Sequence, residues 1–419
     1  MYSFIKIILY LTIISGSLLA FFKYGYKTTF LLPAYLIIFD VIIAFYPVGS
    51  GFGTLRNFLY LILIIFLSIR NKRLLTINVW LILFLIYVLI LIMLSSDLKT
   101  SITNYISTLI SMLSFPIGFY YIRNIKDLKI LNISMITAAI FFIVNNIICL
   151  LLGIGQDAYG GMYTIGGFVG SRMFSASIFL ILLPVILPLN KSKINKMIIA
   201  LSILVFIFIF LSMRRTSVSI IVFGYILYFF YSKKKVMLIT TSIVFLLLVV
   251  LLYPIYKNSL VRQLQARSEI FENPSIENEA RYKETFIIIE ETFSNIKTSL
   301  IGKEAFNSAG NYNKGLWGDR PLHIDYNVIL HGTGLIGLIL YLLIFVDIYK
   351  KYSLYVKFIP DEIYFHELKA IFKIIFILIF IVAFNGGIFA VSYRTIIFLY
   401  IGSILGIFHK YYKYRDSNI

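Results

Sequence analysis

The sequence predicts an all-α, polytopic membrane protein of 12 or 13 transmembrane helices with one large hydrophilic loop. Sixty per cent of its 419 residues are hydrophobic and 14% are charged, whereas a soluble globular chain carries about 25% charged residues. The mean hydropathy is +0.91. Apolar runs close to the ~20 residues that cross a bilayer recur along the whole chain. These observations exclude a soluble globular protein.

Thirteen apolar runs define the expected helices: 3–22, 28–48, 54–70, 77–95, 101–122, 129–152, 173–189, 197–212, 216–232, 236–255, 326–348, 368–386 and 388–408. The first run lacks a convincing small-residue cleavage site, so we expect an uncleaved helix rather than a signal peptide. Thirteen crossings would place the N-terminus outside, opposite the C-terminus. Twelve would place it inside, if one of the first two runs does not cross fully.

The formal charge of +19 comes largely from short basic loops between these runs. The loops are "RNKR" at 70–73, "RNIKDLK" at 123–129, "KSKINK" at 191–196, "KKK" at 233–235 and the tail "HKYYKYR". All of them can lie on one face, which the positive-inside rule makes the cytoplasm. The charge therefore indicates membrane topology and not a nucleic-acid partner.

The hydrophilic segment 256–325 divides an N-terminal helical part, 1–255, from a C-terminal part, 326–419, within one integral unit. It holds nine Lys/Arg and ten Asp/Glu residues, so it is not a polybasic lipid tether. Apolar residues repeat at three- to four-residue spacing from Tyr282 to Leu300. This pattern predicts an amphipathic helix at about 278–300, lying against the outer mouth of the bundle.

Polar residues inside the apolar runs are few. Cys149, the only cysteine, excludes an internal disulfide and a thiolate metal cluster. Asp40 has no visible partner in its run, and an ionisable group there is a candidate functional residue. The sequence has no evident internal repeat, which argues against an inverted-repeat transporter.

Arginines gather at the predicted outer face. Arg214 and Arg215, in "LSMRRTS", lie between two apolar runs on the side where cations are disfavoured. They either extend to lipid headgroups or bind a specific partner. The same topology brings four further arginines to this mouth: Arg172, Arg281, Arg320 and Arg394. Guanidinium groups match phosphate oxygens bidentately and stay charged, so the cluster suits a lipid-linked diphosphate.

The helix predicted after the loop begins with polar residues, in "WGDRPLHIDYNVILHGTGLIGLILYL". With Asp319 as N-cap and Pro321 in the first turn, His323, Asn327 and His331 would share one stripe. Asp325 would point nearly opposite to His323. Either His323 or Asp325 could act as a base on an attacking hydroxyl, whereas His331 is expected to be a packing residue. Two small residues allow a neighbouring helix to approach closely: Gly334 and Gly337.

Three segments together resemble the O-antigen polymerase and O-antigen ligase superfamily of bacterial envelope glycosyltransferases. "LSMRRTS" is similar to its Ser-Arg-(Thr/Gly)-(Ala/Ser) element, with Arg215 in the arginine position. "EARYKETFIIIEETFSNIKTSLIGKEAF" resembles its loop pattern, with Arg281 on the arginine. "HIDYNVILHGTGLIGLILYL" resembles its His-Asn-x-x-Leu pattern, with His323 on the histidine and the two glycines in place. The resemblance covers roughly residues 160–350.

The chain departs from these patterns at three positions. Arg214 replaces a serine, Ile324 an asparagine and Asn327 a leucine. Many polymerases of the group carry an aspartate near position 325, as this chain does. The departures favour a polymerase over a ligase and leave open whether His323 or Asp325 is the more important group.

The resemblance implies a metal-independent, inverting glycosyltransferase of the lipid-sugar-using (GT-C-like) class in the bacterial inner membrane. It would transfer a growing glycan from undecaprenyl diphosphate to an undecaprenyl-diphosphate-linked repeat unit at the periplasmic face, without a cofactor. Arg215 and Arg281 would grip the diphosphate and His323 or Asp325 would act on the acceptor. By their predicted place at the outer mouth and on the polar start of the following helix, Arg214, Arg172, Arg320 and Asn327 are further candidate substrate-binding residues. The implied partners are the lipid-linked oligosaccharide, membrane lipid and a chain-length regulator (a polysaccharide co-polymerase).

Three rival interpretations remain. An O-antigen ligase would use the same donor with a lipid A–core acceptor. A flippase or other polysaccharide-lipid transporter should carry charges buried mid-membrane and pseudo-symmetric halves, while this chain places its cations at one face. A non-catalytic scaffold would tolerate replacement of Arg215, Arg281 and His323.

Overall fold

The computed structural model describes residues 2–44, 51–153, 156–157, 164–165, 172–212, 215–233, 235–272, 280–313, 321–384 and 386–416. The first half of the chain contains these α-helices: α1 (Tyr2–Tyr24), α2 (Leu32–Ala44), α3 (Phe52–Arg70), α4 (Val79–Ile92), α5 (Leu98–Tyr121), α6 (Ile125–Leu152), α7 (Arg172–Ile186) and α8 (Ser192–Leu211). The second half contains α9 (Arg215–Tyr231), α10 (Lys235–Glu272), α11 (Ala280–Thr292), α12 (Ile296–Ile301), α13 (Asp325–Tyr355), α14 (Ile363–Ala383) and α15 (Val391–Asp416).

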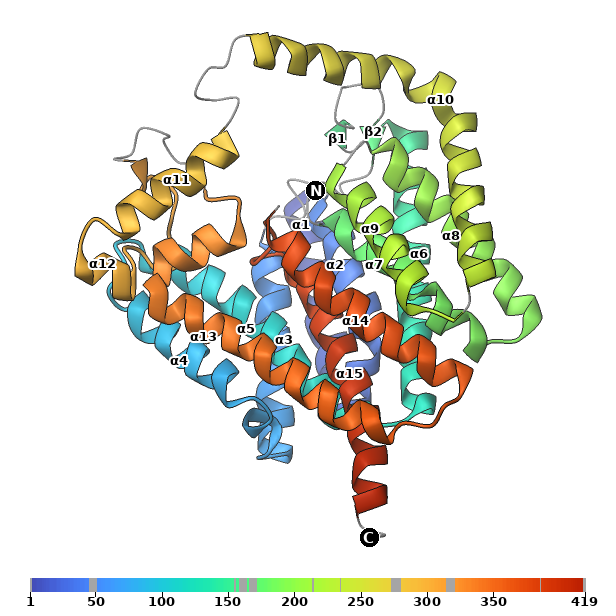
Figure 1. The fold of residues 1–419 in the computed structure, drawn as a ribbon, viewed down its shortest axis with the longest axis horizontal. Helices are drawn as coiled ribbons and strands as arrows, with labels where there is room; N and C mark the ends of the chain where they lie inside the picture. Colours follow the sequence, from blue (N-terminus) through green and yellow to red (C-terminus); the bar gives the residue numbers. More distant parts are fainter. Residues whose placement is uncertain are drawn as a thin grey trace.

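Short elements connect some of these helices. They are the 3-10 helices η1 (Gly25–Leu31), η2 (Leu74–Thr76), η3 (Leu187–Leu189) and η5 (Val356–Phe358), and the strands β1 (Gln156–Asp157) and β2 (Thr164–Ile165). The two strands pair antiparallel over two residues each. The rest of the ordered secondary structure in the described residues is helical (Figure 1).

The protein is a polytopic membrane protein by the length and composition of its helices. Seven helical segments of the described residues are long and apolar enough to cross a bilayer, and four shorter apolar helices accompany them. Each predicted apolar run overlaps one α-helix of the described residues, because an apolar stretch in lipid must satisfy its backbone groups internally. The prediction of an all-helical membrane protein is confirmed.

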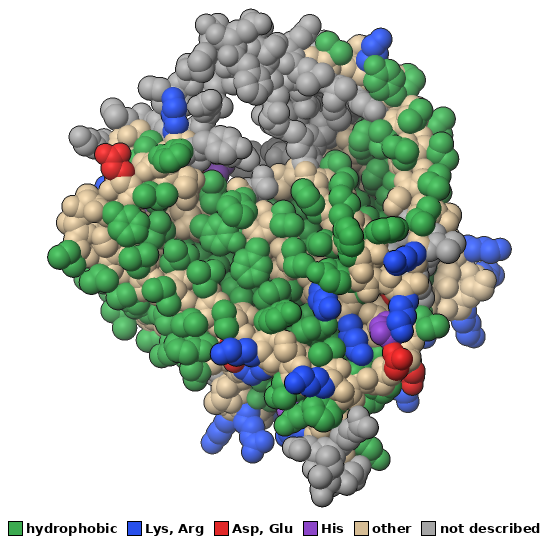
Figure 2. Space-filling model, in the orientation of Figure 1, with side chains coloured by type: hydrophobic (Ala, Val, Ile, Leu, Met, Phe, Trp, Pro, Cys, Tyr) green, Lys and Arg blue, Asp and Glu red, His purple; other side chains and the backbone are tan. Residues whose placement is uncertain are grey.

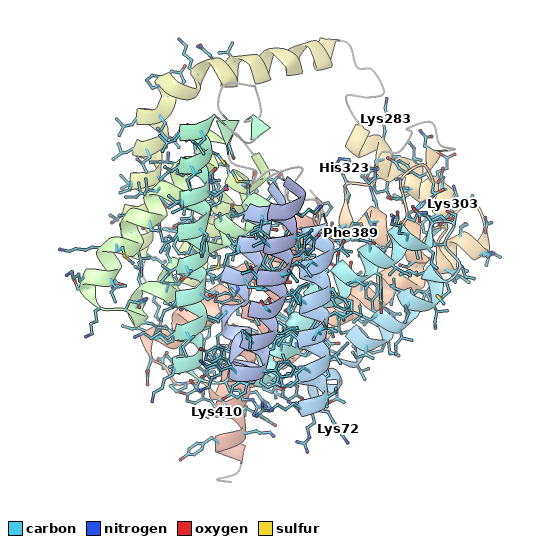
Figure 3. The ribbon with its side chains drawn as sticks, turned by 180° about the vertical axis from the view of Figure 1, so that it is seen from behind. Lys72, Lys283, Lys303, His323, Phe389 and Lys410 are labelled. Atoms are coloured by element: carbon cyan, nitrogen blue, oxygen red, sulfur yellow. The ribbon has the colours of Figure 1, made fainter. Side chains whose placement is uncertain are left out.

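The bundle has two distinct ends. Short connections make consecutive helices antiparallel, so alternate connections lie at the same end. Lys72 and Lys410 lie at one end, where α15 terminates, and Lys283 and His323 lie at the other (Figure 3). We call these the basic end and the loop end. Lys and Arg side chains gather around the basic end, whereas apolar side chains cover much of the face between the ends (Figure 2).

Helix α15 forms the central column of the bundle. Its apolar window is fully buried inside the protein, and it packs closely along α5. A methyl group added at Gly402 would overlap the backbone of Phe115, and one added at Gly118 would overlap the backbone of Leu399. Glycines therefore allow the two helix backbones to touch, as is typical of helix pairs in membranes.

Three details differ from the sequence prediction. Helix α10 continues to Glu272, well into the predicted hydrophilic loop, although Pro254 lies where its apolar run stops. The single helix predicted at 278–300 is two helices, since Asn295 caps a new helix by accepting from the Thr298 amide at 2.9 Å. Helix α13 begins only at Asp325, so His323 precedes the helix and does not share its stripe.

Candidate functional site

Glu284 of α11 connects the loop segment to the start of α13. Its carboxylate is fully buried. Its Oε1 accepts hydrogen bonds from the backbone amides of His323 at 3.0 Å and Ile324 at 3.3 Å, and from Asn327 Nδ2 at 3.1 Å. These donors surround the N-terminus of α13, where a helix leaves its first amides unsatisfied and favours negative charge. Glu284 thus caps α13 from another segment of the chain.

His323 is held in a defined orientation beside this carboxylate. Its Nδ1 lies 2.9 Å from the carbonyl oxygen of Pro321 and 3.8 Å from Glu284 Oε2. Because a carbonyl can only accept, Nδ1 carries the proton, and in the neutral ring the lone pair lies on Nε2. The side chain remains 37% exposed. A proton acceptor with a fixed tautomer and a neighbouring carboxylate is the arrangement that general-base catalysis needs.

Asp325 is engaged in a buried ion pair with Arg394 of α15. Both side chains are almost completely buried. The other oxygen of Asp325, Oδ1, accepts from the Ile388 backbone amide at 2.8 Å. Asp325 therefore ties the start of α13 to the turn between α14 and α15. Arg394 lies near the loop end, together with the starts of the helices that carry other predicted arginines. The charge of Arg394 is compensated within the protein by Asp325.

The turn between α14 and α15 also lies against His323. A methyl group added at Gly386 would overlap the His323 carbonyl oxygen, and Gly386 has a φ of +84°. Only glycine adopts that backbone conformation without strain and leaves room for the approach. The segment 321–324 is thus enclosed between α11 and this turn. Figure 3 shows His323 near Lys283 and above Phe389 of the same turn.

The predicted glycine of the α13 motif has a clear structural role. Gly334 has a φ of 63° and interrupts the helical backbone of α13. The break frees the His331 carbonyl, which accepts from the Lys303 backbone amide at 2.7 Å. A methyl group at Gly334 would overlap the backbone of Leu300. The close approach that the sequence predicts is real, and its partner is the loop segment around α12.

We expect Gly334→Ala to lower the free energy of unfolding by at least about 1–3 kcal/mol, the cost of a non-glycine residue in a disfavoured backbone conformation. The overlap with Leu300 adds to this cost. Thermal unfolding of the purified full-length protein measures it. Gly16→Ala is the matched control, because nothing lies within 4 Å of the added methyl group in α1. An equal Tm for Gly334→Ala and the wild type would contradict the packing described above.

The starts of α7 and α9 lie close to the Asp325–Arg394 ion pair. Ser177 Oγ of α7 donates to the Ser217 carbonyl of α9 at 3.2 Å, which places the two helix starts side by side. Near the same end of α7, the Phe174 ring packs on Tyr393 of α15 with 5.3 Å between ring centroids. Tyr393 adjoins Arg394 in the sequence. A continuous set of contacts therefore joins α9 and α7 to α15, and through Asp325 to α13.

The remaining predicted site residues are placed in part. Arg172 and Arg215 are the first residues of α7 and α9, and Arg281 is the second residue of α11, so the backbones of all three lie at the loop end. Their side chains, and all of Arg214 and Arg320, lie outside the described part of the structure. Asn327 is buried and also donates to Thr285 Oγ1 of α11 at 3.0 Å. His331 is buried, as expected for a packing residue, with Nε2 3.3 Å from the Asn311 carbonyl.

A second buried ion pair lies in the N-terminal part of the bundle. Asp40 Oδ1 of α2 is 2.8 Å from the guanidinium of Arg56 on α3, which also donates to Ser392 Oγ of α15 at 3.4 Å. Asp40 therefore has a partner, and its pairing supplies a structural explanation for an ionisable group in an apolar run. The sequence offered no sign of this pair beyond the presence of one acid and one arginine in neighbouring runs.

Glu284 is the residue that sequence reasoning missed. It lies in the predicted amphipathic helix one turn after Arg281, where an acidic residue is expected to belong to the solvent-exposed face.

Within the described residues, no group of three or more His, Cys, Asp or Glu side chains has the arrangement of a metal site. Comparison with protein-family models and with curated protein sequences finds no match to this chain.

Proposed function

We propose that this protein is a surface-polysaccharide polymerase of the O-antigen polymerase class. The observation that carries the proposal is the Glu284–His323 pair, which joins the loop helix α11 to the head of α13. The three sequence motifs resembling the superfamily fall on α9, α11 and α13, and all three of these helices begin at the loop end. Segments far apart in the chain would then form one site.

The proposed topology follows from the charge distribution. Thirteen helices, α1 to α10 and α13 to α15, would cross the membrane. The basic end would face the cytoplasm, by the positive-inside rule. The loop end, with His323, would then face the periplasm of a bacterial inner membrane. This arrangement suits a lipid-linked substrate whose diphosphate lies at the outer surface and whose tail stays in the bilayer.

The proposed reaction forms one glycosidic bond and breaks one sugar–phosphate bond. A hydroxyl of the acceptor repeat unit attacks the anomeric carbon of the donor glycan, with inversion. Its proton passes to His323 Nε2, and the Glu284 carboxylate stabilises the imidazolium that forms. Undecaprenyl diphosphate leaves with the bonding electron pair. Its charge would be stabilised by Arg215 and Arg281, assisted by Arg214, Arg172 and Arg320.

In this proposal Asp325 holds the start of α13 against the turn between α14 and α15 and does not take up the proton. Its two oxygens accept from Arg394 and from the Ile388 amide, so a proton taken up there would cost a buried ion pair. His323 has a partly exposed ring and is therefore the preferred base. Asn327 would act through Glu284, to which it donates a hydrogen bond.

The test is the polysaccharide ladder of a strain that lacks the gene. Reintroducing the wild-type gene should restore a ladder, and Arg215→Ala should reduce it to a single repeat unit at unchanged protein level. Lys233→Ala, a cation at the basic end, is the matched control and should restore the full ladder. A normal ladder from Arg215→Ala would contradict the diphosphate assignment. If deletion leaves the ladder but abolishes its attachment to lipid A–core, the protein is a ligase.

A further inference from the structure

A cavity of about 430 Å³ lies at the basic end, far from the candidate site. Helices α9, α13 and α14 and the short helix η5 enclose it. Its lining includes three tyrosines and four basic side chains: Tyr231, Tyr349, Tyr352, Lys357, His366, Lys369 and Lys373. Figure 2 shows basic, histidine and acidic side chains together on the face over the lower parts of α13 and α14. Its volume is within the range of small-molecule sites.

Three of the basic residues form a stripe on α14. His366, Lys369 and Lys373 are three and four residues apart, so they share one face of the helix. Lys373 lies ten residues into α14, roughly 15 Å from the start of the helix at 1.5 Å per residue. Loop charges set membrane topology, but a lysine this far along an apolar helix needs a separate explanation, because ionisable residues within a membrane are costly.

Among the described residues, the lysines of the cavity form no ion pair with an acidic side chain. Within the described residues, neither Lys357, Lys369 nor Lys373 has a carboxylate oxygen within 4.0 Å. The nearby Asp361 pairs instead with His366 and, at 3.6 Å, with Lys233. The hydrogen bond with His366 and the charge of Lys233 hold the pKa of Asp361 below its usual value. The cavity therefore carries a net positive charge that a bound anion could neutralise.

An exposed apolar surface leads to the cavity along α13. Leu342, Val346 and Tyr349 are four and three residues apart on one stripe, and their side chains are exposed. Tyr349 belongs to the cavity wall. On α9, the exposed Phe230 adjoins Tyr231 of the opposite wall. An apolar surface that ends in a basic, tyrosine-lined cavity matches a molecule with acyl chains and an anionic head.

We propose that this cavity binds an anionic phospholipid of the cytoplasmic leaflet, with its phosphate among Lys357, Lys369 and Lys373 and its acyl chains along α13. Basic pockets between transmembrane helices at the cytoplasmic surface recognise anionic headgroups in this way. Tyrosine rings suit the boundary between headgroup and chains. The site is independent of the proposed polymerase reaction, which takes place at the opposite end of the bundle.

A second basic cavity supplies the matched control. It has about 1020 Å³ and lies between the α5–α6 connection and the end of α15. Its cations are Arg123, Lys126, Lys410 and Lys413. They come from the α5–α6 connection, the first turn of α6 and the last turns of α15 beyond its buried part, where the positive-inside rule accounts for them. Removing three of these charges changes the net charge as much as removing the three lysines of the first cavity.

Native mass spectrometry of the purified full-length protein tests the proposal with dioleoyl phosphatidylglycerol and dioleoyl phosphatidylcholine as probes. The wild type should retain phosphatidylglycerol more tightly. The triple variant Lys357→Gln/Lys369→Gln/Lys373→Gln should lose about tenfold or more of this affinity, since each cation near a charged surface contributes to binding. The control Lys126→Gln/Lys410→Gln/Lys413→Gln should bind as the wild type does, and excess inorganic phosphate should not displace the lipid.

Three results would overturn the proposal. They are equal retention of the two lipids by the wild type, equal losses in the two triple variants, and displacement by inorganic phosphate, which would indicate a site for a free anion. A second measurement does not depend on the stability of the triple variant. In Tyr349→Trp, phosphatidylglycerol with brominated chains should quench the added fluorescence more strongly than brominated phosphatidylcholine, and equal quenching would also reject a specific site.

Discussion

Replacing Arg394 by alanine should lower the free energy of unfolding by about 3 to 5 kcal/mol, because it leaves the buried Asp325 carboxylate without its counter-ion. Both side chains are almost fully buried, and the pair connects α13 to α15, the central helix of the bundle. Thermal unfolding of the purified protein, followed by the loss of monodisperse material, measures the change. Arg123→Ala, an exposed loop position, is the control and should change stability by less than about 0.5 kcal/mol.

The double variant Asp325→Asn/Arg394→Met separates the missing charge from the missing side chain. It removes both charges, so no buried ion is left uncompensated, and it should be more stable than Arg394→Ala. If the double variant is as unstable as the single one, the effect comes from packing and the pairing contributes little. An unchanged Tm for Arg394→Ala would show that the buried ion pair does not hold these helices together.

Glu284 should affect both the position of His323 and its reactivity. In Glu284→Gln the amide oxygen can still accept from the backbone amides of His323 and Ile324, so stability should stay close to that of the wild type. The negative charge is lost, and repeat-unit transfer should fall by about 10²-fold, the lower range for an acid–base group. Glu284→Ala should lose stability as well, because buried amides then lack an acceptor.

The contrast between these variants identifies what the carboxylate does. Glu290→Gln changes an exposed acid on the same helix and should leave both stability and transfer unchanged. Ladder length in cells measures transfer, and thermal unfolding measures stability. If Glu284→Gln supports a full ladder, the carboxylate is only a cap for α13 and its charge has no part in the reaction.

The sequence predicts the helices well because membrane helices are set by local composition. Each apolar run becomes a helix, and the basic loops gather at one end. Helix ends are predicted less well where no local signal marks them. The start of α13 at Asp325 depends on Glu284 of another segment, which accepts from the preceding backbone amides. Helix α10 continues to Glu272 past Pro254, a residue type that usually ends a helix.

The candidate site was predicted only in part, because its pairings join residues far apart in the chain. Glu284 lies 39 residues before His323, and Asp325 lies 69 residues before Arg394. Neither pairing leaves a periodic pattern or a short motif. The sequence does predict that another segment packs closely against Gly334, because a glycine near the polar start of a helix leaves room for it. Only the structure identifies that segment, which is the backbone around Leu300.

The most direct measurement uses the purified full-length protein with an undecaprenyl-diphosphate-linked repeat unit as its sole substrate. The wild type should convert the single unit into longer lipid-linked glycans and release undecaprenyl diphosphate. His323→Ala should elongate about 10²- to 10⁴-fold more slowly, because it removes the base that accepts the hydroxyl proton. If the wild type leaves the substrate unchanged while monodisperse, or if His323→Ala elongates at the wild-type rate, the proposed polymerase site is wrong.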